Sequence, residues 1–182
     1  MTTMGALTVR LALTGAPGTG KTTLAGLLMS AYDVHAVRTL AEACGALGTV
    51  EDDGAHPIDI ALLSTYVERL EGDVLVEGHL SHHLHPDAIV VLRCAPSILS
   101  ERLRLRGYGA SKIQANTEWE LLGGVHAELR DAEVDVPMLE LDATSVGPDA
   151  LAAQVLAWRD GGYARQIEPL IDWLADPNHL PS

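Results

Sequence analysis

The chain has 182 residues, of which 47% are hydrophobic, so it can form one globular domain with a sizeable core, and a disordered chain is excluded. Its 25 acidic and 12 basic residues give a formal net charge of −13, which excludes binding to DNA or RNA through a broad basic surface. Two isolated cysteines argue against a zinc ribbon or a disulfide framework, and no uncharged apolar run reaches the roughly 18 residues of a membrane helix. We therefore expect a soluble, cytoplasmic protein.

The strongly acidic composition is also poor in lysine, because the basic residues include only Lys21 and Lys112. Two interpretations stay open. A high-salt cytoplasm favours carboxylates over lysine, and a GC-rich genome favours arginine, alanine, glycine and aspartate.

Apolar runs of strand length alternate with stretches of helical periodicity, which predicts an α/β fold with a five-stranded parallel sheet and helices on both faces. The strands are expected at 6–14, 34–37, 74–77, 88–92 and 138–141. The helices are expected at 22–32, 58–70, 96–105, 111–132, 149–160 and 163–175, with an irregularity at Gly123 and Gly124. Segment 39–57 is too interrupted by glycines for one long element. No linker divides the chain, so residues 1–182 are expected to form a single domain.

A phosphate-binding loop follows the first predicted strand. Residues 15–22 read GAPGTGKT and match the G-x-x-x-x-G-K-[ST] pattern at every fixed position. Gly18 and Gly20 let the backbone turn its N–H groups toward phosphate oxygens. Lys21 can reach the β and γ phosphates, and the Thr22 hydroxyl can take a position on Mg²⁺. Thr23 can contact the α phosphate. The pattern predicts ATP binding.

A second carboxylate is needed for the magnesium shell, and the strand 74–77 ends on one, Glu77. His79 follows two residues later. Both are expected at the C-terminal edge of the sheet, where open α/β folds bind ligands. An N-K-x-D motif for guanine is absent, which disfavours a GTPase switch protein.

Three segments together carry a family resemblance: GAPGTGKTTLA, VEGHLSHHL, and VVLRCAPSILSERLRLRGY followed by KI and N. From about residue 7 to 158 the chain resembles the archaeal and nuclear adenylate-kinase-like family known as adenylate kinase isoenzyme 6. The resemblance implies a P-loop nucleoside monophosphate kinase fold, with an insert for the monophosphate at about 33–57 and a short lid at about 105–115.

The same resemblance implies roles for particular residues. Arg106 matches the lid arginine that lies against ATP and neutralises the transferring phosphates. Glu77 stands where many members have Asp, which keeps the charge and lengthens the side chain, so contact with Mg²⁺ through water is expected over direct contact. His79 matches a histidine that orients water in the family's ATPase activity. The expected catalytic set is thus Lys21, Glu77, His79 and Arg106, with ATP and Mg²⁺ as cofactors.

The roles of several other charged residues stay open. Arg102 and Arg104 can touch phosphates or form a solvated face, and Arg93 can reach phosphates or cap the sheet. The histidines at 79, 82, 83 and 85 suggest a metal, but their spacing matches no common ligand set and no cysteine accompanies them. Arg38, the one arginine between Arg10 and Arg69, cannot be aligned securely with the arginine that standard adenylate kinases place in the insert.

The expected reaction is transfer of the ATP γ-phosphate to AMP or another nucleoside monophosphate, with ATP hydrolysis as a side activity. Family members also act in small ribosomal subunit maturation and rRNA processing, through transient binding of a ribosomal protein of the S-eleven type. Two alternatives remain: an assembly ATPase with little kinase activity, and a P-loop kinase of a small metabolite such as shikimate or gluconate.

Overall fold

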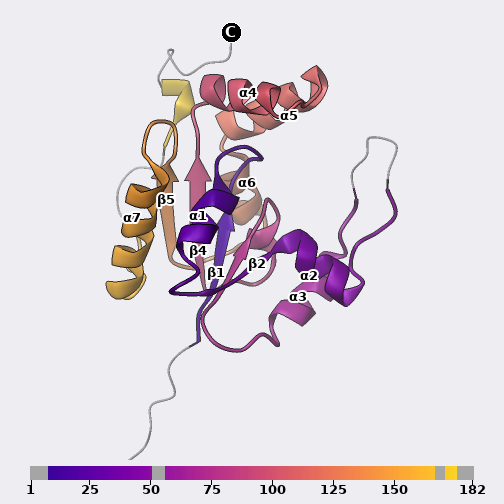
Figure 1. The fold of residues 1–182 in the computed structure, drawn as a ribbon, viewed down its shortest axis with the longest axis vertical. Coiled ribbons are helices and arrows are strands. Elements are labelled where there is room, and N and C mark those ends of the chain that lie inside the picture. Colours follow the sequence, from indigo (N-terminus) through magenta and orange to yellow (C-terminus); the bar gives the residue numbers. More distant parts are fainter. Residues whose placement is uncertain (1–7, 51–55, 167–170, 176–182) are drawn as a thin grey trace, which may run out of the picture.

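The computed structural model describes residues 8–50, 56–166 and 171–175. Its centre is one parallel sheet in the strand order β2-β3-β1-β4-β5 (Figure 1). The strands are β1 (Arg10–Thr14), β2 (Asp33–Ala36), β3 (Val74–Glu77), β4 (Ala88–Arg93) and β5 (Met138–Asp142). The predicted α/β class with a five-stranded parallel sheet is confirmed. Because every pairing is parallel, all five strands end at the same edge.

Helices cover both faces of this sheet. They are α1 (Lys21–Leu27), α2 (Val37–Cys44), α3 (Ile60–Val67), α4 (Pro96–Leu105), α5 (Ala110–Leu121), α6 (Gly124–Asp131) and α7 (Pro148–Asp160), with two short 3₁₀ turns, η1 (Ser81–His83) and η2 (Trp173–Ala175). None of the helices in these ranges is long and apolar enough to cross a bilayer.

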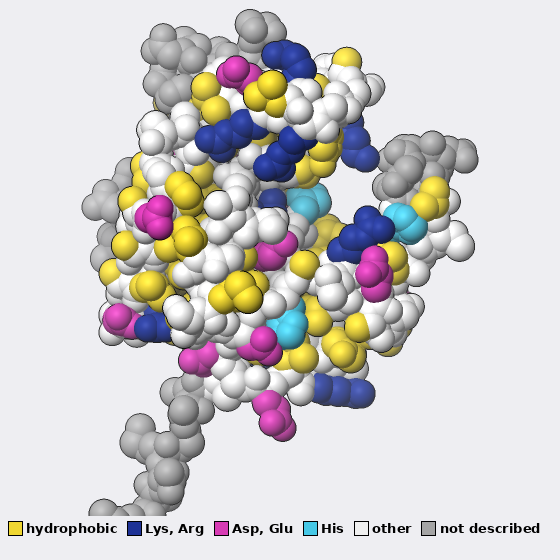
Figure 2. All heavy atoms as spheres, viewed as in Figure 1, with side chains coloured by type: hydrophobic (Ala, Val, Ile, Leu, Met, Phe, Trp, Pro, Cys, Tyr) yellow, Lys and Arg dark blue, Asp and Glu magenta, His cyan; other side chains and the backbone are white. Residues whose placement is uncertain are grey.

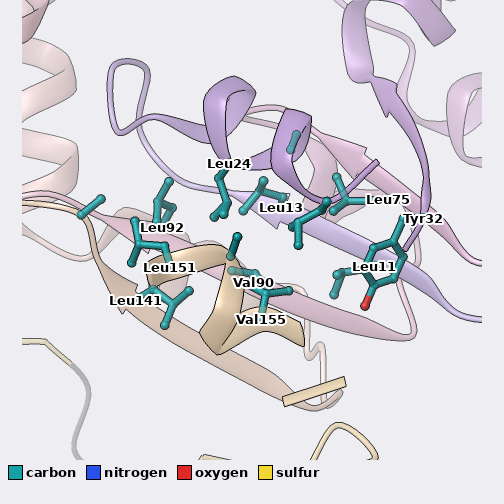
Figure 3. Packing of buried hydrophobic residues seen from close by; sticks show 14 of the residues in the cluster. Leu11, Leu13, Leu24, Tyr32, Leu75, Val90, Leu92, Leu141, Leu151 and Val155 are labelled. Carbon is teal, nitrogen blue, oxygen red and sulfur yellow. The ribbon is translucent and has the colours of Figure 1, made fainter. Parts of the chain in front are cut away.

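The strands alternate their apolar side chains between two cores. On one face, Leu11 and Leu13 of β1 pack with α1 and α7, as Figure 3 shows for the labelled residues. On the other face, Ala12 of the same strand belongs to a cluster that includes α6, while Val74 and Val76 of β3 pack with α2 and α3. Burial on both faces explains why these strands appear in the sequence as continuous apolar runs.

Segment 39–57 holds no single long element, as predicted: α2 ends at Cys44, because Gly45 follows it at φ 75°. Val37, expected in the second strand, begins α2, because Val37, Leu40 and Ala41 make a buried helical face. The helix expected at 111–132 is two helices, α5 and α6, and the break falls at Gly123 and Gly124, where an irregularity was expected.

The tail differs from the helix expected at 163–175. The described residues at 163–166 and 171–172 carry no helix, and 173–175 form only η2; residues 167–170 lie outside the described ranges. The first predicted strand also begins later, at Arg10, and its residues 6 and 7 lie outside the description.

Two groups of helices project beyond the sheet. Helices α4 and α5 pack on each other above the strand ends, and α2 and α3 form an arm to one side (Figure 1). The sheet edge that carries the predicted site lies between them.

Candidate functional site

The segment GAPGTGKT connects β1 to α1 at the C-terminal edge of the sheet. Gly15 sits against β4, where an added Cβ would lie 2.2 Å from the carbonyl oxygen of Leu92, and its φ is +137°. Only glycine fits there, since both the contact and the φ exclude a side chain. The loop predicted from the sequence is therefore fixed in place by the neighbouring strand.

Lys21 is buried inside this loop. Its Nζ donates hydrogen bonds to the carbonyl oxygens of Gly15 and Ala16, each at 2.8 Å. Burial lowers the pKa of Lys21 to about 8, and the positive charge of Arg106 adds a smaller effect in the same direction. The ammonium group is held by neutral carbonyls, so its charge is available to an anion.

Thr22 and Glu77 meet at the start of α1. The Thr22 hydroxyl donates to Oε1 of Glu77 at 3.3 Å, and Glu77 is the last residue of β3. The two oxygens form the hard donor set that Mg²⁺ prefers. Gly18, Gly20 and Thr23 lie in the same loop and in the first turn of α1.

His79 lies two residues beyond Glu77 and is largely buried. Its ring packs edge-on against Trp119 of α5, with ring centroids 4.9 Å apart. Burial, helped by the charge of Lys21, lowers its pKa, so the imidazole is neutral at pH 7. Within the described part of the chain, its buried Nδ1 has no hydrogen-bond partner. A hydrogen bond with the backbone of Gly15 raises the pKa of His79 by a smaller amount, and the neutral imidazole can accept a proton.

Arg106 stands at the C-terminal end of α4 and is exposed. It begins the turn to α5, inside the predicted lid at 105–115. Figure 2 shows an open cleft between the lobe of α4 and α5 and the arm of α2 and α3, with basic side chains gathered on the lobe's side. Helix α2 of the arm lies within the predicted insert at 33–57, whose residues 51–55 are outside the described ranges, and α3 follows the insert. Arg38 is exposed on α2 and pairs with Glu42 at 3.0 Å.

Two arginines whose roles the sequence left open make contacts that stabilise the fold. Arg93 caps the sheet: it is 2% exposed and contacts carboxylate oxygens of Glu120 and Glu140, each at 2.6 Å. Arg102 donates to the carbonyl oxygens of Ala143 and Thr144, at 2.9 and 3.3 Å, and so holds the loop after β5.

Arg104, the third arginine whose role the sequence left open, is exposed on α4. The contacts of Arg93 with Glu120 and Glu140 exclude the alternative in which Arg93 reaches the phosphates. The contacts of Arg102 with two backbone carbonyls exclude a solvated position for it.

Sequence reasoning did not identify Trp119, which packs against His79, or Glu128, which faces His82 and His83. The Nε1 of Trp119 donates to Oε1 of Glu128 at 2.9 Å. No local pattern marks either residue, because α5 and α6 are brought to the site by packing on the sheet.

The chain resembles known proteins over most of its length. The family described as "AAA domain" matches residues 11–123. A protein of Pyrococcus abyssi named "Putative adenylate kinase" is 36% identical over 169 residues, covering 90% of each chain. A protein of the same name from Halobacterium salinarum is 40% identical over 155 residues, covering 84% of this chain and 91% of the relative.

Solved structures share the fold at low identity. The shikimate kinase of Acinetobacter baumannii superposes with a TM-score of 0.61 at 13% identity, covering 86% of this chain and 95% of that one. A gluconokinase of Sinorhizobium meliloti gives 0.54 at 19% identity, covering 82% and 90%. These similarities show a fold that small-molecule phosphotransferases use.

Proposed function

Because the chain belongs to the adenylate-kinase-like P-loop family of archaeal proteins, we propose that it transfers the γ-phosphoryl group of ATP to a nucleoside monophosphate, with AMP as the expected acceptor. The observation that carries the proposal is the position of Lys21. Its Nζ lies in a glycine-rich loop at the sheet edge and, within the described residues, donates its hydrogen bonds to neutral carbonyls at 2.8 Å. A phosphate can compete with these carbonyls for the ammonium group.

Each proposed site residue then has a distinct task. Backbone amides of the loop, through Gly18 and Gly20, hold phosphate oxygens, and Lys21 neutralises charge on the β and γ phosphates. Thr23 contacts the α phosphate. Arg106, at the C-terminal end of α4, neutralises the group in transfer, and α4 packs on the loop through Leu99 and Leu103. Catalysis by positioning and charge needs no strong base for an acceptor phosphate.

Thr22 and Glu77 are proposed to hold Mg²⁺, directly or through water. Their oxygens are 3.3 Å apart, and both donors are of the type this ion prefers. Held by these two residues, the ion would offset the negative charge of the phosphates.

ATP hydrolysis is the proposed side activity. His79 is proposed to act in hydrolysis but not in transfer to AMP. A neutral imidazole can orient a water molecule and accept its proton, whereas transfer to AMP does not need that step. We expect His79→Ala to lower hydrolysis more than transfer. Equal hydrolysis in the variant and the wild type would remove His79 from the mechanism.

The test is a coupled assay of ADP formation with ATP and Mg²⁺, without acceptor and with AMP, CMP, GMP or UMP in turn. Strong stimulation by a monophosphate is expected, and Lys21→Ala should abolish it. Arg69→Ala is the matched control, since it removes one positive charge at an exposed position after α3. Slow hydrolysis that no monophosphate stimulates contradicts the kinase proposal, and activity with shikimate or gluconate would support a metabolite kinase.

A second candidate function is an ATP-dependent step in small ribosomal subunit maturation. The observation that favours it is the net charge of −13, because ribosomal proteins are basic and opposite charges speed association. The test is binding to a ribosomal protein of the S-eleven type at increasing salt. Affinity that falls steeply with salt supports this role, and no binding at low salt excludes it.

A further inference from the structure

A cluster of two histidines and one carboxylate lies beside the proposed site. Nε2 of His82 and Nε2 of His83, both on η1, lie 2.8 and 3.0 Å from the same oxygen, Oε2 of Glu128 on α6. One ligand atom from each residue falls within 4.8 Å of the others. We call these three residues the triad. It joins the turn after β3 to a helix 45 positions further along the chain.

Neighbouring side chains fix the orientation of the triad. Trp119 holds the second oxygen of Glu128, as described above, which aims Oε2 at the histidines. Nδ1 of His82 lies 2.8 Å from the hydroxyl of Thr14, the last residue of β1. Carboxylates and imidazoles that bind metals are held in this way, each by a hydrogen bond on the atom that faces away from the ion.

Thr14 allows His82 to present a lone pair. If Nε2 of His82 binds a cation, its proton must sit on Nδ1 and be donated to the Thr14 hydroxyl. That hydroxyl then has its own acceptor, the carbonyl oxygen of His79, at 3.2 Å. The change of tautomer leaves no buried donor unsatisfied.

We propose that His82, His83 and Glu128 bind a divalent transition-metal ion of the Zn²⁺ and Co²⁺ type. Two imidazole nitrogens and one carboxylate oxygen are a donor set that selects these ions over Mg²⁺. Bonds of about 2.0–2.1 Å at tetrahedral angles place ligand atoms about 3.3 Å apart, so the two short contacts open by a few tenths of an ångström. The side chains of His83 and Glu128 are 28% and 34% exposed, which leaves a path for the ion and a position for water.

The ion would tie η1 to α6 directly behind His79, whose carbonyl contacts Thr14 and whose ring contacts Trp119. It is distinct from the Mg²⁺ of the proposed kinase site, whose donors are oxygens. The proposal therefore does not depend on the kinase activity.

The test is a Co²⁺ titration of the untagged full chain after treatment with a chelator, without nucleotide and in excess Mg²⁺, which occupies the oxygen site. The readout is the visible absorption of Co²⁺ bound through nitrogen, with Zn²⁺ as competitor. We expect one equivalent, and at least about a tenfold loss of affinity in His83→Asn and in Glu128→Gln. Circular dichroism and thermal unfolding without metal check that both variants fold.

His85→Asn is the matched control. His85 also contacts a carboxylate, Glu68 at 2.9 Å, but it is exposed and outside the triad, and asparagine tolerates its φ of 49°. The affinity of the His85→Asn variant for Co²⁺ should equal that of the wild type. No absorption change in excess Co²⁺, or equal binding by the wild type and folded His83→Asn, overturns the proposal. A folded chain that binds Co²⁺ but transfers no phosphate would contradict only the kinase function.

Discussion

Two buried cations lie near the C-terminal edge of the sheet, and their charges are balanced differently. Lys21 donates to neutral carbonyls, whereas Arg93 is neutralised by two carboxylates and also donates to the carbonyl of Glu120. The first arrangement leaves charge for a ligand, and the second leaves none. Burial raises the pKa of Glu120, whose Oε2 has no partner within the described ranges.

Glu140 behaves in the opposite way although it shares Arg93. Burial raises its pKa, but hydrogen bonds from His126, the backbone of Ile171 and Arg93 outweigh this effect, and its pKa is lowered. Within the described residues, each carboxylate accepts three hydrogen bonds, but those of Glu120 all fall on Oε1, whereas those of Glu140 are shared between both of its oxygens. The unpaired Oε2 of the more deeply buried Glu120 explains the difference.

Nucleotide affinity should fall as the pH rises above about 8. The free protein loses the Lys21 proton near that pH, and bound phosphates raise the pKa again, so binding takes up a proton. We expect about a tenfold weaker affinity for ATP at about pH 9 than at about pH 7. Titration calorimetry in two buffers of different ionisation enthalpy measures both the affinity and the proton uptake. Constant affinity, or proton release, would show that Lys21 does not hold the phosphates.

Replacing Arg93 by Met should destabilise the protein by about 3–5 kcal/mol, because Glu120 and Glu140 would be left buried without their cation. Urea unfolding at neutral pH measures the change. The loss should shrink in acid, where a protonated carboxylate needs no cation. Arg104→Met, at an exposed position on α4, is the control and should change stability by less than about 0.5 kcal/mol. A change in stability this small for Arg93→Met would mean that Arg93 does not pair with Glu120 and Glu140.

At the scale of elements, the break between α5 and α6 places the residues around His79. Gly123 adopts φ 65°, and an added Cβ on Gly124 would lie 2.2 Å from the ring of Trp119. A helix that continued straight through Gly123 and Gly124, where the sequence predicted an irregularity, would place Glu128 elsewhere. The two glycines let α6 turn so that Glu128 meets both Trp119 and η1.

Gly124→Ala should therefore displace Trp119 and destabilise the protein by about 1–3 kcal/mol. Near-ultraviolet circular dichroism reports the tryptophan environment, and thermal unfolding gives the stability. Gly26→Ala is the matched control: no atom lies within 4 Å of its added Cβ in the described structure, and it sits in α1. There alanine should stabilise by about 0.5–1 kcal/mol. Stabilisation by both substitutions would mean that Trp119 does not pack on Gly124.

At the scale of the whole molecule, the net charge of −13 is spread over a chain with only two lysines, one of them buried. The acidic groups repel one another in the compact state, and salt screens that repulsion. The excess of acid is also what favours a basic macromolecular partner.

Added KCl should raise the melting temperature. Between 0.1 and 1 M salt the screening length falls from about 10 to about 3 Å. A gain of about 1 kcal/mol corresponds to about 2–4 °C for a domain of this size. Scanning calorimetry or fluorescence melting measures it, with a nonionic cosolute of equal osmolarity as control. A melting temperature that KCl leaves unchanged would favour the genomic explanation of the composition over the high-salt one.

The sequence alone determined the features that depend on neighbours in the chain. The loop GAPGTGKT is recognisable because its eight adjacent residues build one phosphate cradle. Strands β3 and β4 are recognisable because burial on both faces demands uninterrupted apolar runs. Glu77 and His79 could be placed at the sheet edge for the same reason, since the end of a parallel strand fixes their position.

Only the tertiary structure decided how residues far apart in the chain pair. Arg93 was ambiguous because its partners lie 27 and 47 positions away, on α5 and β5. The histidine run lacked a metal-ligand spacing because the third member of the triad, Glu128, arrives 46 positions after His82 on another helix. Such contacts depend on how helices pack against the sheet, and that packing depends on the whole core rather than on any local sequence pattern.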